Sequence, residues 1–521
     1  MCIRDSWELG GWQSAQGPLY TIYETLIHLD RYDESYVPYL AESWEIGAGA
    51  QEWTFKLKEG IPFYKNKQPT QYSVTVEDVI HSYRVNNFPP YQQGIPGIAA
   101  QSGIEDRHFD VKSDYEFTWK LDTPDLTWGY WSSDDRRGVI SKTYWDEVGD
   151  EAYSEDPIGA GPFTFNWFGL NQGLIVERVE DHYRQTPAFH ELQFFYVPEE
   201  ATRTAMLYTN EADIVSIARS LLPQAVERGY QIVNSTTPSS YTFLFIGGMF
   251  SSTRSDGYNN CPPGDDIKPD ENNMCPPGRY EIDEESPMRV KEVREALNLA
   301  INRDEMNEVF FDGQGVPTSH WAFPPWWPHA KAEWAPYPYD PARARELITA
   351  AGYPDGFAME VYVPEAVTGL PEIGEMSEVI AQYFEQVGLD VTLRPINSAE
   401  QTSIPRNREY TRGVMQTRFG PPSGGQLVRH FKNNINWRQE WQMHDEIYDF
   451  VKRLESSSDW DTLRAIEIEA AEWARDNHLM IPLWWLVGQV VINPDIVASY
   501  ESRHLHMGPS RHHEYTVPVY K

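Results

Sequence analysis

The chain has little cysteine, little positive charge and no long apolar run. Three cysteines among 521 residues are too few for a disulfide-rich scaffold. Lysine and arginine number 43 against 78 aspartate and glutamate residues, and the formal net charge is −35. This charge argues against nucleic acid or an anionic membrane as a partner, because both would repel the protein. No segment is apolar over the length that spans a bilayer, in line with the mean hydropathy of −0.56.

Signature motifs of the common enzyme classes are absent as well. The chain contains no Gly-x-Ser-x-Gly elbow, no P-loop, no His-Glu-x-x-His and no complete Gly-x-Gly-x-x-Gly. We therefore predict that the protein is not an enzyme and carries no cofactor. An acidic glycoside hydrolase remains a distant alternative, since its two carboxylates form no sequence motif.

The length predicts at least two lobes, because 521 residues exceed the size at which a single core stops growing. Near the start, Trp53, Phe55 and Leu57 alternate with polar residues, which predicts a strand with one buried face. Thr75, followed by Asp78 three residues later, predicts the capped start of a helix. These are the elements of an ordinary α/β protein.

Five groups of residues occur in an order that is more informative than any one group. They are Pro38–Trp44 with Glu52–Phe63 and Thr75–Val79, then Asp156–Phe163, Val293–Asp304, Tyr339–Phe357 and Val387–Leu393. In this order they resemble the extracytoplasmic solute-binding proteins of peptide-type ABC importers, known as family 5. Two positions depart from the family pattern, because Ala160 stands where threonine is usual and Asn302 where aspartate is usual.

The resemblance implies an α/β, two-lobed periplasmic-binding-protein fold of type II, similar to cluster C, with an accessory subdomain inserted in the first lobe. The expected parts are a first lobe of residues 1–43, 156–240 and 480–521, an accessory subdomain of residues 44–155, and a second lobe of residues 241–479 with a Pro/Gly/Asp-rich loop at 251–286. We expect a helix from Gly17 to Leu29 and one long helix from about Arg289 to Phe311. Ile481–Trp485 is expected to begin the return to the first lobe.

The same resemblance implies the substrate-binding component of an ABC importer. Such a protein captures a solute in the cleft between its lobes by hinge closure and delivers it to a membrane permease. An oligopeptide is the expected solute class, with cello- or xylo-oligosaccharides as the alternative and chelated metals as a third. We expect a monomer, periplasmic or extracellular, either free or lipid-anchored. Met1–Ser6 has no apolar signal-peptide core, so a truncated or processed start is expected.

One departure from the family concerns the anchor for the ligand. Peptide-binding members hold the α-amino group with an aspartate in a Trp-x-x-Asp-x-x-Asp-Pro segment. The matching stretch here, Gln416–Gly425, has neither tryptophan nor aspartate and places Arg418 and Phe419 instead. A guanidinium suits a carboxylate or a sugar hydroxyl, although a structural arginine is the alternative.

Tryptophan is the second indication of a site, with 19 residues in the chain. Aromatic faces stack on sugar rings and on apolar side chains. We expect Trp326 and Trp327, in a proline-rich segment, to contact the ligand together with Trp131 and Tyr23. The alternative is that these tryptophans pack in the core, which is the more common fate of the residue.

The 251–286 loop carries two cysteines in a repeated Cys-Pro-Pro-Gly. A disulfide between Cys261 and Cys275 is the prediction, with two free surface thiols as the alternative. The acidic residues between them could hold a calcium ion, but they fit no EF-hand spacing, which favours a solvated acidic loop. We expect the histidine-rich C-terminal segment to be a solvated tail and not a metal site. Its histidines are His504, His506, His512 and His513.

Overall fold

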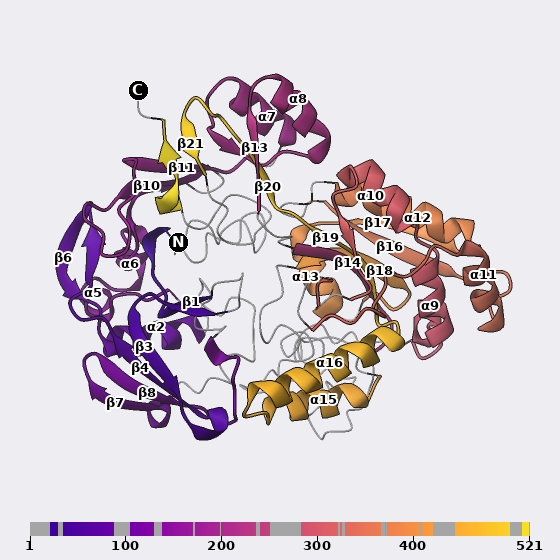
Figure 1. Cartoon of the computed structure of the whole chain (residues 1–521), viewed down its shortest axis with the longest axis horizontal. Helices are drawn as coiled ribbons and strands as arrows, with labels where there is room; N and C mark the ends of the chain where they lie inside the picture. The colour runs from indigo at the N-terminus through magenta and orange to yellow at the C-terminus, as the bar shows by residue number, and fades with distance from the viewer. Residues whose placement is uncertain are drawn as a thin grey trace. The chain divides into compact units, whose positions relative to one another are not determined.

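The structure is a computed structural model. It describes residues 21–29, 35–87, 105–129, 138–169, 172–197, 199–235, 240–250, 283–320, 323–325, 329–365, 370, 372–406, 409–419, 443–500 and 513–519. The chain divides into two compact units, the first comprising Met1–Thr237, Ser457–Asp459 and Gly488–Lys521, the second Pro238–Ser456 and Trp460–Val487 (Figure 1). No helix in these described ranges combines the length and the apolar character needed to cross a membrane.

The first unit is built from small antiparallel sheets and short helices. The larger sheets are β3-β4-β8-β7 (Ala41–Ile46, Glu52–Leu57, Glu116–Lys120, Phe109–Ser113), β11-β10-β9 (Glu191–Phe195, Gly173–Arg178, Phe163–Gly169) and β12-β20-β13 (Ile214–Val215, Gln489–Ile492, Gln231–Asn234). The strand pairs are β1-β2 (Ile27–Leu29, Tyr36–Pro38), β5-β6 (Pro62–Lys65, Gln68–Ser73) and β21-β22 (Val497–Ser499, Val517–Pro518). Its helices are α2 (Val76–Asn87), α5 (Lys142–Val148), α6 (Asp150–Glu155), α7 (Glu200–Tyr208) and α8 (Leu222–Glu227).

The alternating pattern of β4 forms the core of this unit as predicted. Trp53, Phe55 and Leu57 are fully buried, while Glu52 and Lys56 are exposed. The Trp53 ring lies 5.5 Å from the buried ring of Trp128, which gives this sheet an aromatic core.

The predicted start of α2 is also confirmed. The Asp78 carboxylate accepts from the backbone N–H and from the hydroxyl of Thr75, each at 2.8 Å. This closes the first turn of the helix, where backbone N–H groups have no partner within the helix. By contrast, the predicted helix from Gly17 to Leu29 is wrong from residue 23 onward, since only Thr21 and Ile22 of the described part are helical. Ile27–Leu29 is strand β1, paired antiparallel with β2, because the pairing with a neighbouring strand outweighs the local pattern.

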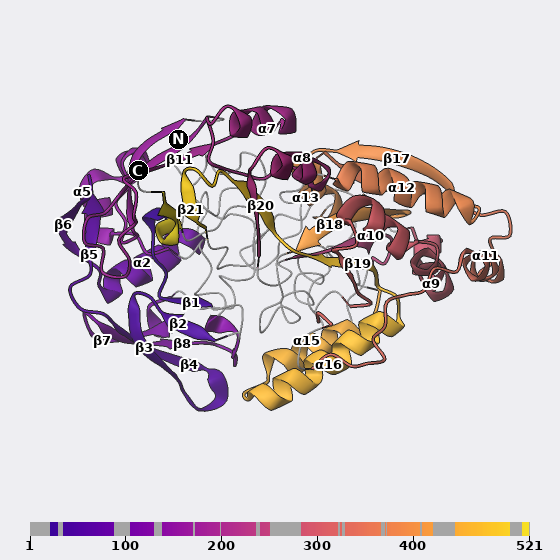
Figure 2. The same cartoon turned by 45° about the horizontal axis from the view of Figure 1, so that its top comes forward.

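The second unit contains a mixed six-stranded sheet (Figures 1 and 2). Its order is β15-β19-β14-β18-β16-β17 (Val316–Pro317, Met480–Leu486, Ser240–Ile246, Gly413–Phe419, Ala358–Pro364, Asp390–Ile396). Pairing is antiparallel from β15 to β18 and parallel from β18 to β17. The helices are α9 (Lys291–Leu299), α10 (Arg303–Phe311), α11 (Pro341–Ala350), α12 (Ile373–Gln386), α13 (Ser398–Arg406), α15 (Glu446–Glu455) and α16 (Trp460–Asp476). Helix α12 lies along β16 and β17, while α15 and α16 lie side by side in both views.

The single long helix predicted from Arg289 to Phe311 is two helices, α9 and α10. Asn302 separates them, because its side chain accepts a hydrogen bond from the backbone N–H of Glu305 and so caps α10. The guanidinium of Arg303 is buried and donates to the carbonyls of Asn298, in α9, and Pro482, in β19. The motif residues therefore join two helices to the sheet.

Strand β19 stays within the second unit. It pairs with β14 on one side and with β15 on the other, so the chain returns to the first unit only after Val487. The sequence had placed this return at residue 480. All seven residues of β19 are buried, and a continuous apolar run gives no indication of which sheet will receive it.

Candidate ligand-binding site

Two of the residues predicted to contact the ligand lie at the end of β18. The backbone of Arg418 is paired with Thr242 of β14, and that of Phe419 with Tyr241. The side chains of both residues lie outside the described part of the chain. The position of these two residues therefore follows from the pairing of β18 with β14.

One face of β14 beside this point is aromatic. The rings of Tyr241 and Phe243 are stacked at 5.2 Å, and Phe243 meets Phe245 edge-on at 4.7 Å. Trp485 of β19 lies 4.7 Å from Tyr241. All four residues are at most 2% exposed, so this ladder is core packing that stiffens the sheet next to the strand end.

The opposite face of β14 is polar at the same point. Gln416 of β18 donates through Nε2 to the Thr242 hydroxyl at 3.2 Å. Its Oε1 lies 3.0 Å from the hydroxyl of Ser377 in α12, which shares its one proton between this oxygen and the Ile373 carbonyl at 2.7 Å. The Thr242 hydroxyl donates in turn to the carbonyl of Thr417 at 3.1 Å. Thr242, Gln416 and Ser377 are all fully buried. The network connects three elements two residues before Arg418.

Several of the described tryptophans are core residues, whereas Trp167 is 41% and Trp460 is 40% exposed. Trp484 of β19 is fully buried and meets the Phe311 ring edge-on at 5.4 Å, while Trp128 is 1% exposed and Trp334 is 9% exposed. For these the alternative of core packing holds. Trp131, Trp326 and Trp327 lie outside the described residues, so their roles as ligand contacts stay predictions.

The remaining predicted residues belong to other places. Tyr23 is in the core of the first unit and is 9% exposed. Cys261 and Cys275 lie outside the described residues, and their disulfide stays a prediction. His513 is described and is 3% exposed, with its ring 5.2 Å from that of Phe194. The solvated tail predicted for the C-terminal histidines is wrong at this residue, because the β21-β22 segment folds back onto the first unit.

Sequence patterns missed a buried ionic cluster in the first unit. Arg184 donates to Glu24 through Nη2 at 2.6 Å and to Glu514 through Nη1 at 2.5 Å. Its guanidinium also lies over the ring of Tyr39, at 4.6 Å. Both carboxylates are 1% exposed. The partners are 160 and 330 residues away in the sequence, so no local spacing indicates the pairing.

The environment of this cluster perturbs its charges. Burial raises the pKa of Glu24 to about 7, with Arg184 opposing the shift and Glu514 adding to it. Burial disfavours the charge of Arg184, but Glu24 and Glu514 outweigh that effect and its pKa is raised. Two carboxylates around one guanidinium leave an excess negative charge, which burial penalises. We interpret the cluster as structural, because its members bind each other.

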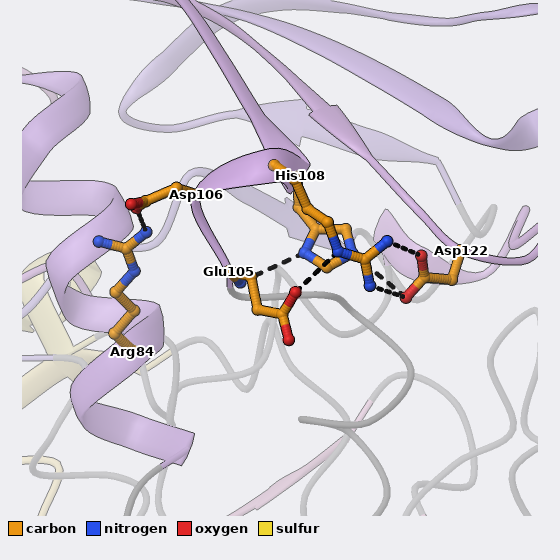
Figure 3. Close-up of polar contacts among 6 residues, drawn as sticks. Arg84, Glu105, Asp106, His108 and Asp122 are labelled. Carbon is orange, nitrogen blue, oxygen red and sulfur yellow. Dashed lines mark hydrogen bonds and ion pairs between the residues drawn. The ribbon is translucent and has the colours of Figure 1, made fainter.

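A second polar cluster lies where η3 (Asp106–His108) approaches the end of β8 (Figure 3). Arg107 donates to both oxygens of Asp122, at 3.0 and 3.2 Å. His108 accepts from the backbone N–H of Glu105 through Nδ1, so its Nε2 carries the proton that faces Asp122 at 3.2 Å. Burial alone would raise the pKa of Asp122, but His108 and Arg107 lower it. Because its members bind each other, we interpret this cluster as structural, holding the short helix η3 beside the end of β8.

Within the described ranges no three or more histidine, cysteine, aspartate or glutamate side chains are grouped to hold a metal ion.

Comparison with known proteins gives a consistent result. The model of the bacterial extracellular solute-binding proteins, family 5, matches residues 35–437. Heme-binding protein A of Haemophilus influenzae is 23% identical over 407 residues, covering 75% of this chain and 68% of that protein. The dipeptide-binding protein of Escherichia coli is 24% identical over 409 residues, covering 76% and 70%.

Solved structures agree on the fold. The periplasmic binding protein DppA from Helicobacter pylori, in complex with the peptide STSA, has a TM-score of 0.77 at 18% identity and covers 100% of this chain and 96% of its own. NikA from Brucella suis, in complex with Fe(III)-EDTA, has a TM-score of 0.76 at 17% identity, covering 97% and 95%. The fold is thus that of the two-lobed periplasmic binding proteins.

Proposed function

Because the chain belongs to the family 5 bacterial extracellular solute-binding proteins, we propose that it is the component of an ABC importer that captures an oligopeptide-class solute. The match of the family model to residues 35–437 carries this proposal. Two similar proteins support the peptide class, since one is named a dipeptide-binding protein and another a probable di/tripeptide-binding protein. The protein binds its solute without changing it.

Capture by hinge closure is part of the proposal. The chain passes from one unit to the other at residues 237–238, between 456 and 460, and at 487–488. Strands β14 and β19 therefore carry the chain up to two of these passages. A solute that contacts both units favours the closed state by its higher affinity for that state. A membrane permease then receives the loaded protein, which acts as a monomer outside the cytoplasm.

Arg418 and Phe419 are the proposed contacts at the end of β18. A guanidinium binds a carboxylate through two parallel hydrogen bonds, so Arg418 would hold the terminal carboxylate or an acidic side chain of a peptide. Trp131, Trp326 and Trp327 complete the proposed set, and Tyr23 is left out because it packs in the core of the first unit. No amine anchor is proposed, because Gln416–Gly425 contains no aspartate.

A thermal-shift screen of the full chain tests the function. One pool holds di- to hexapeptides and the other holds cello- and xylo-oligosaccharides. A ligand at about a hundred times its dissociation constant adds roughly 2.7 kcal/mol to the stability of the folded state. The proposal predicts a raised melting temperature with peptides alone, and a shift with sugars alone would contradict it.

Modified peptides then test the anchor. For peptides without acidic side chains, amidation of the carboxyl terminus is expected to abolish the shift, whereas acetylation of the amino terminus is expected to leave it. Arg418→Ala should match the effect of amidation. Arg343→Ala is the control, since Arg343 makes an exposed ion pair with Glu346 on α11. Loss of the shift on acetylation alone would assign recognition to the amine instead.

A further inference from the structure

The buried network of Thr242, Gln416 and Ser377 lies in a core that is otherwise apolar. The neighbouring positions Leu244, Val414 and Ile380 are fully buried hydrophobic residues. A side-chain amide in such a place is unfavourable unless its polar atoms find partners, and both ends of the Gln416 amide do so. An apolar residue of similar shape at position 416 would fill the same space without needing any hydrogen bond. A satisfied buried network instead fixes one arrangement of the elements that it joins.

Backbone pairing of β18 is one-sided where the network lies. Strand β16 pairs with β18 only from Gly413 to Met415, so among the described strands only β14 holds the part of β18 from Gln416 to Phe419. On the other side of β14, the register with β19 shifts between Thr242 and Phe243. The end of β18 is therefore held by one regular ladder, that with β14, and this ladder has no support from a described strand on its other side.

The network supplies a second constraint on this register. Thr242 is the pairing partner of Arg418, and its hydroxyl bonds both the Gln416 side chain and the Thr417 carbonyl. Ser377 connects the same amide to α12. A slip of β18 by one residue would exchange the faces of alternate side chains and would break all of these bonds.

We propose that Gln416 and Thr242 are positioning residues that lock the register of β18, so that residues 418 and 419 meet the solute in a single arrangement. The inference rests on the proposed function for its ligand. Its structural part, the anchoring of the strand end, does not depend on a ligand.

Matched variants test the anchoring. Thr242→Val removes the hydroxyl and keeps the shape, whereas Thr242→Ser keeps the hydroxyl. Gln416→Leu removes the amide. Leu347→Ala, at a buried position of α11, is a destabilised control away from the network. Amide hydrogen exchange at residues 417–419 should become at least about tenfold faster in Thr242→Val and Gln416→Leu and should stay at the wild-type rate in the other two.

Affinity for the peptide that gives the largest wild-type thermal shift provides the second readout. Thr242→Val and Gln416→Leu should raise the dissociation constant by at least about tenfold, whereas the two controls should raise it by less than about twofold. Combining the two substitutions should weaken binding by less than the product of the single effects, because both break one network.

The outcomes separate the two claims. Wild-type exchange rates in Thr242→Val overturn the anchoring, and this variant decides the question even where Gln416→Leu does not fold. Equal weakening by all four variants overturns the positioning role. A wild-type chain that binds no peptide overturns the proposed function and the ligand part of this inference, while the exchange result still decides the anchoring.

Discussion

Arg184 holds together parts of the first unit that are far apart in the sequence. It binds Glu24 near one end of the chain and Glu514 near the other. Replacing a buried ion pair by apolar groups is often tolerated, but removing one partner leaves a buried charge uncompensated. At the scale of single residues, this cluster is therefore the most sensitive point of the unit.

Arg184→Met is expected to lower the free energy of unfolding by about 3–5 kcal/mol, because two buried carboxylates lose their cation. Urea denaturation followed by tryptophan fluorescence measures this loss. Arg343→Met is the matched control and is expected to cost less than about 1 kcal/mol, since its ion pair with Glu346 is exposed. Equal stabilities of the two variants would contradict the account.

Glu24 gives a pH dependence with a defined sign. Its pKa is about 7 in the folded state and near 4.5 when unfolded, so between these values the folded protein keeps a proton that the unfolded chain releases. The contribution of Glu24 to stability is thus fully present below pH 4.5 and is lost as the pH rises through 7. The change amounts to at most about 3 kcal/mol.

Glu24→Gln isolates this effect, because glutamine keeps the shape and does not titrate. The stability of the wild type minus that of the variant should fall from pH 4.5 to 7 and then level off. A difference that stays flat or rises over this range would show that folding does not raise the pKa of Glu24.

At the scale of helices and strands, Asn302 decides where α9 ends and α10 begins. The motif around it predicted one helix, and the apolar spacing is indeed continuous from α9 into α10. The break arises because the short side chain of Asn302 accepts a hydrogen bond from the backbone N–H of Glu305 and so starts a new helix. Asn302→Ala is expected to lower the free energy of unfolding by about 1 kcal/mol, whereas Asn302→Asp should be nearly neutral because aspartate caps equally well. Thermal denaturation of both variants checks this, and equal losses would argue against a capping role.

Elements with local determinants were predictable. The alternation of Trp53, Phe55 and Leu57 and the pairing of Thr75 with Asp78 depend on residues close in the sequence. The sheet that receives β19 depends on partners more than 150 residues away and left no local pattern. The same limit applies to the site, because the polar network of Gln416 exists only once β14, β18 and α12 have met.

At the scale of the whole molecule, buried histidines make the stability of the protein depend on pH. Four of them are held neutral, because burial lowers the pKa of His182, His444 and His478 to about 4 and that of His320 to about 3. Each is protonated near pH 6.5 in the unfolded chain, so stability falls as the pH drops below that value. At about pH 5 these four should gain protons on unfolding while Glu24 releases one, a net uptake of roughly three.

The pH dependence of the free energy of unfolding measures this proton uptake. Stability that rises from pH 4.5 to 6.5 is the expected result despite the opposite slope of Glu24. His320→Gln should reduce the slope, since His320 is fully buried and bonds the carbonyl of Ala471 at 3.0 Å. A flat profile would show that these histidines titrate normally.

At the scale of the whole molecule, order along the chain was the decisive signal. Short groups of residues from Pro38 to Leu393 predicted a family that the family model then matched over residues 35–437. The solute was less predictable than the family, because specificity depends on a few side chains at strand ends and in loops. Similar chains are named for heme, peptides and nickel, so membership by itself does not select among them.

The most direct test is to identify what the protein holds after exposure to a mixed pool of di- to hexapeptides and oligosaccharides. The full chain is incubated with the pool, separated from free solute, denatured, and its released ligand is measured by mass spectrometry. The account predicts intact peptides in about a one-to-one ratio to protein, because it proposes one binding site and no chemistry on the solute. Recovery of sugars alone, or of peptides cut into shorter products, would contradict it.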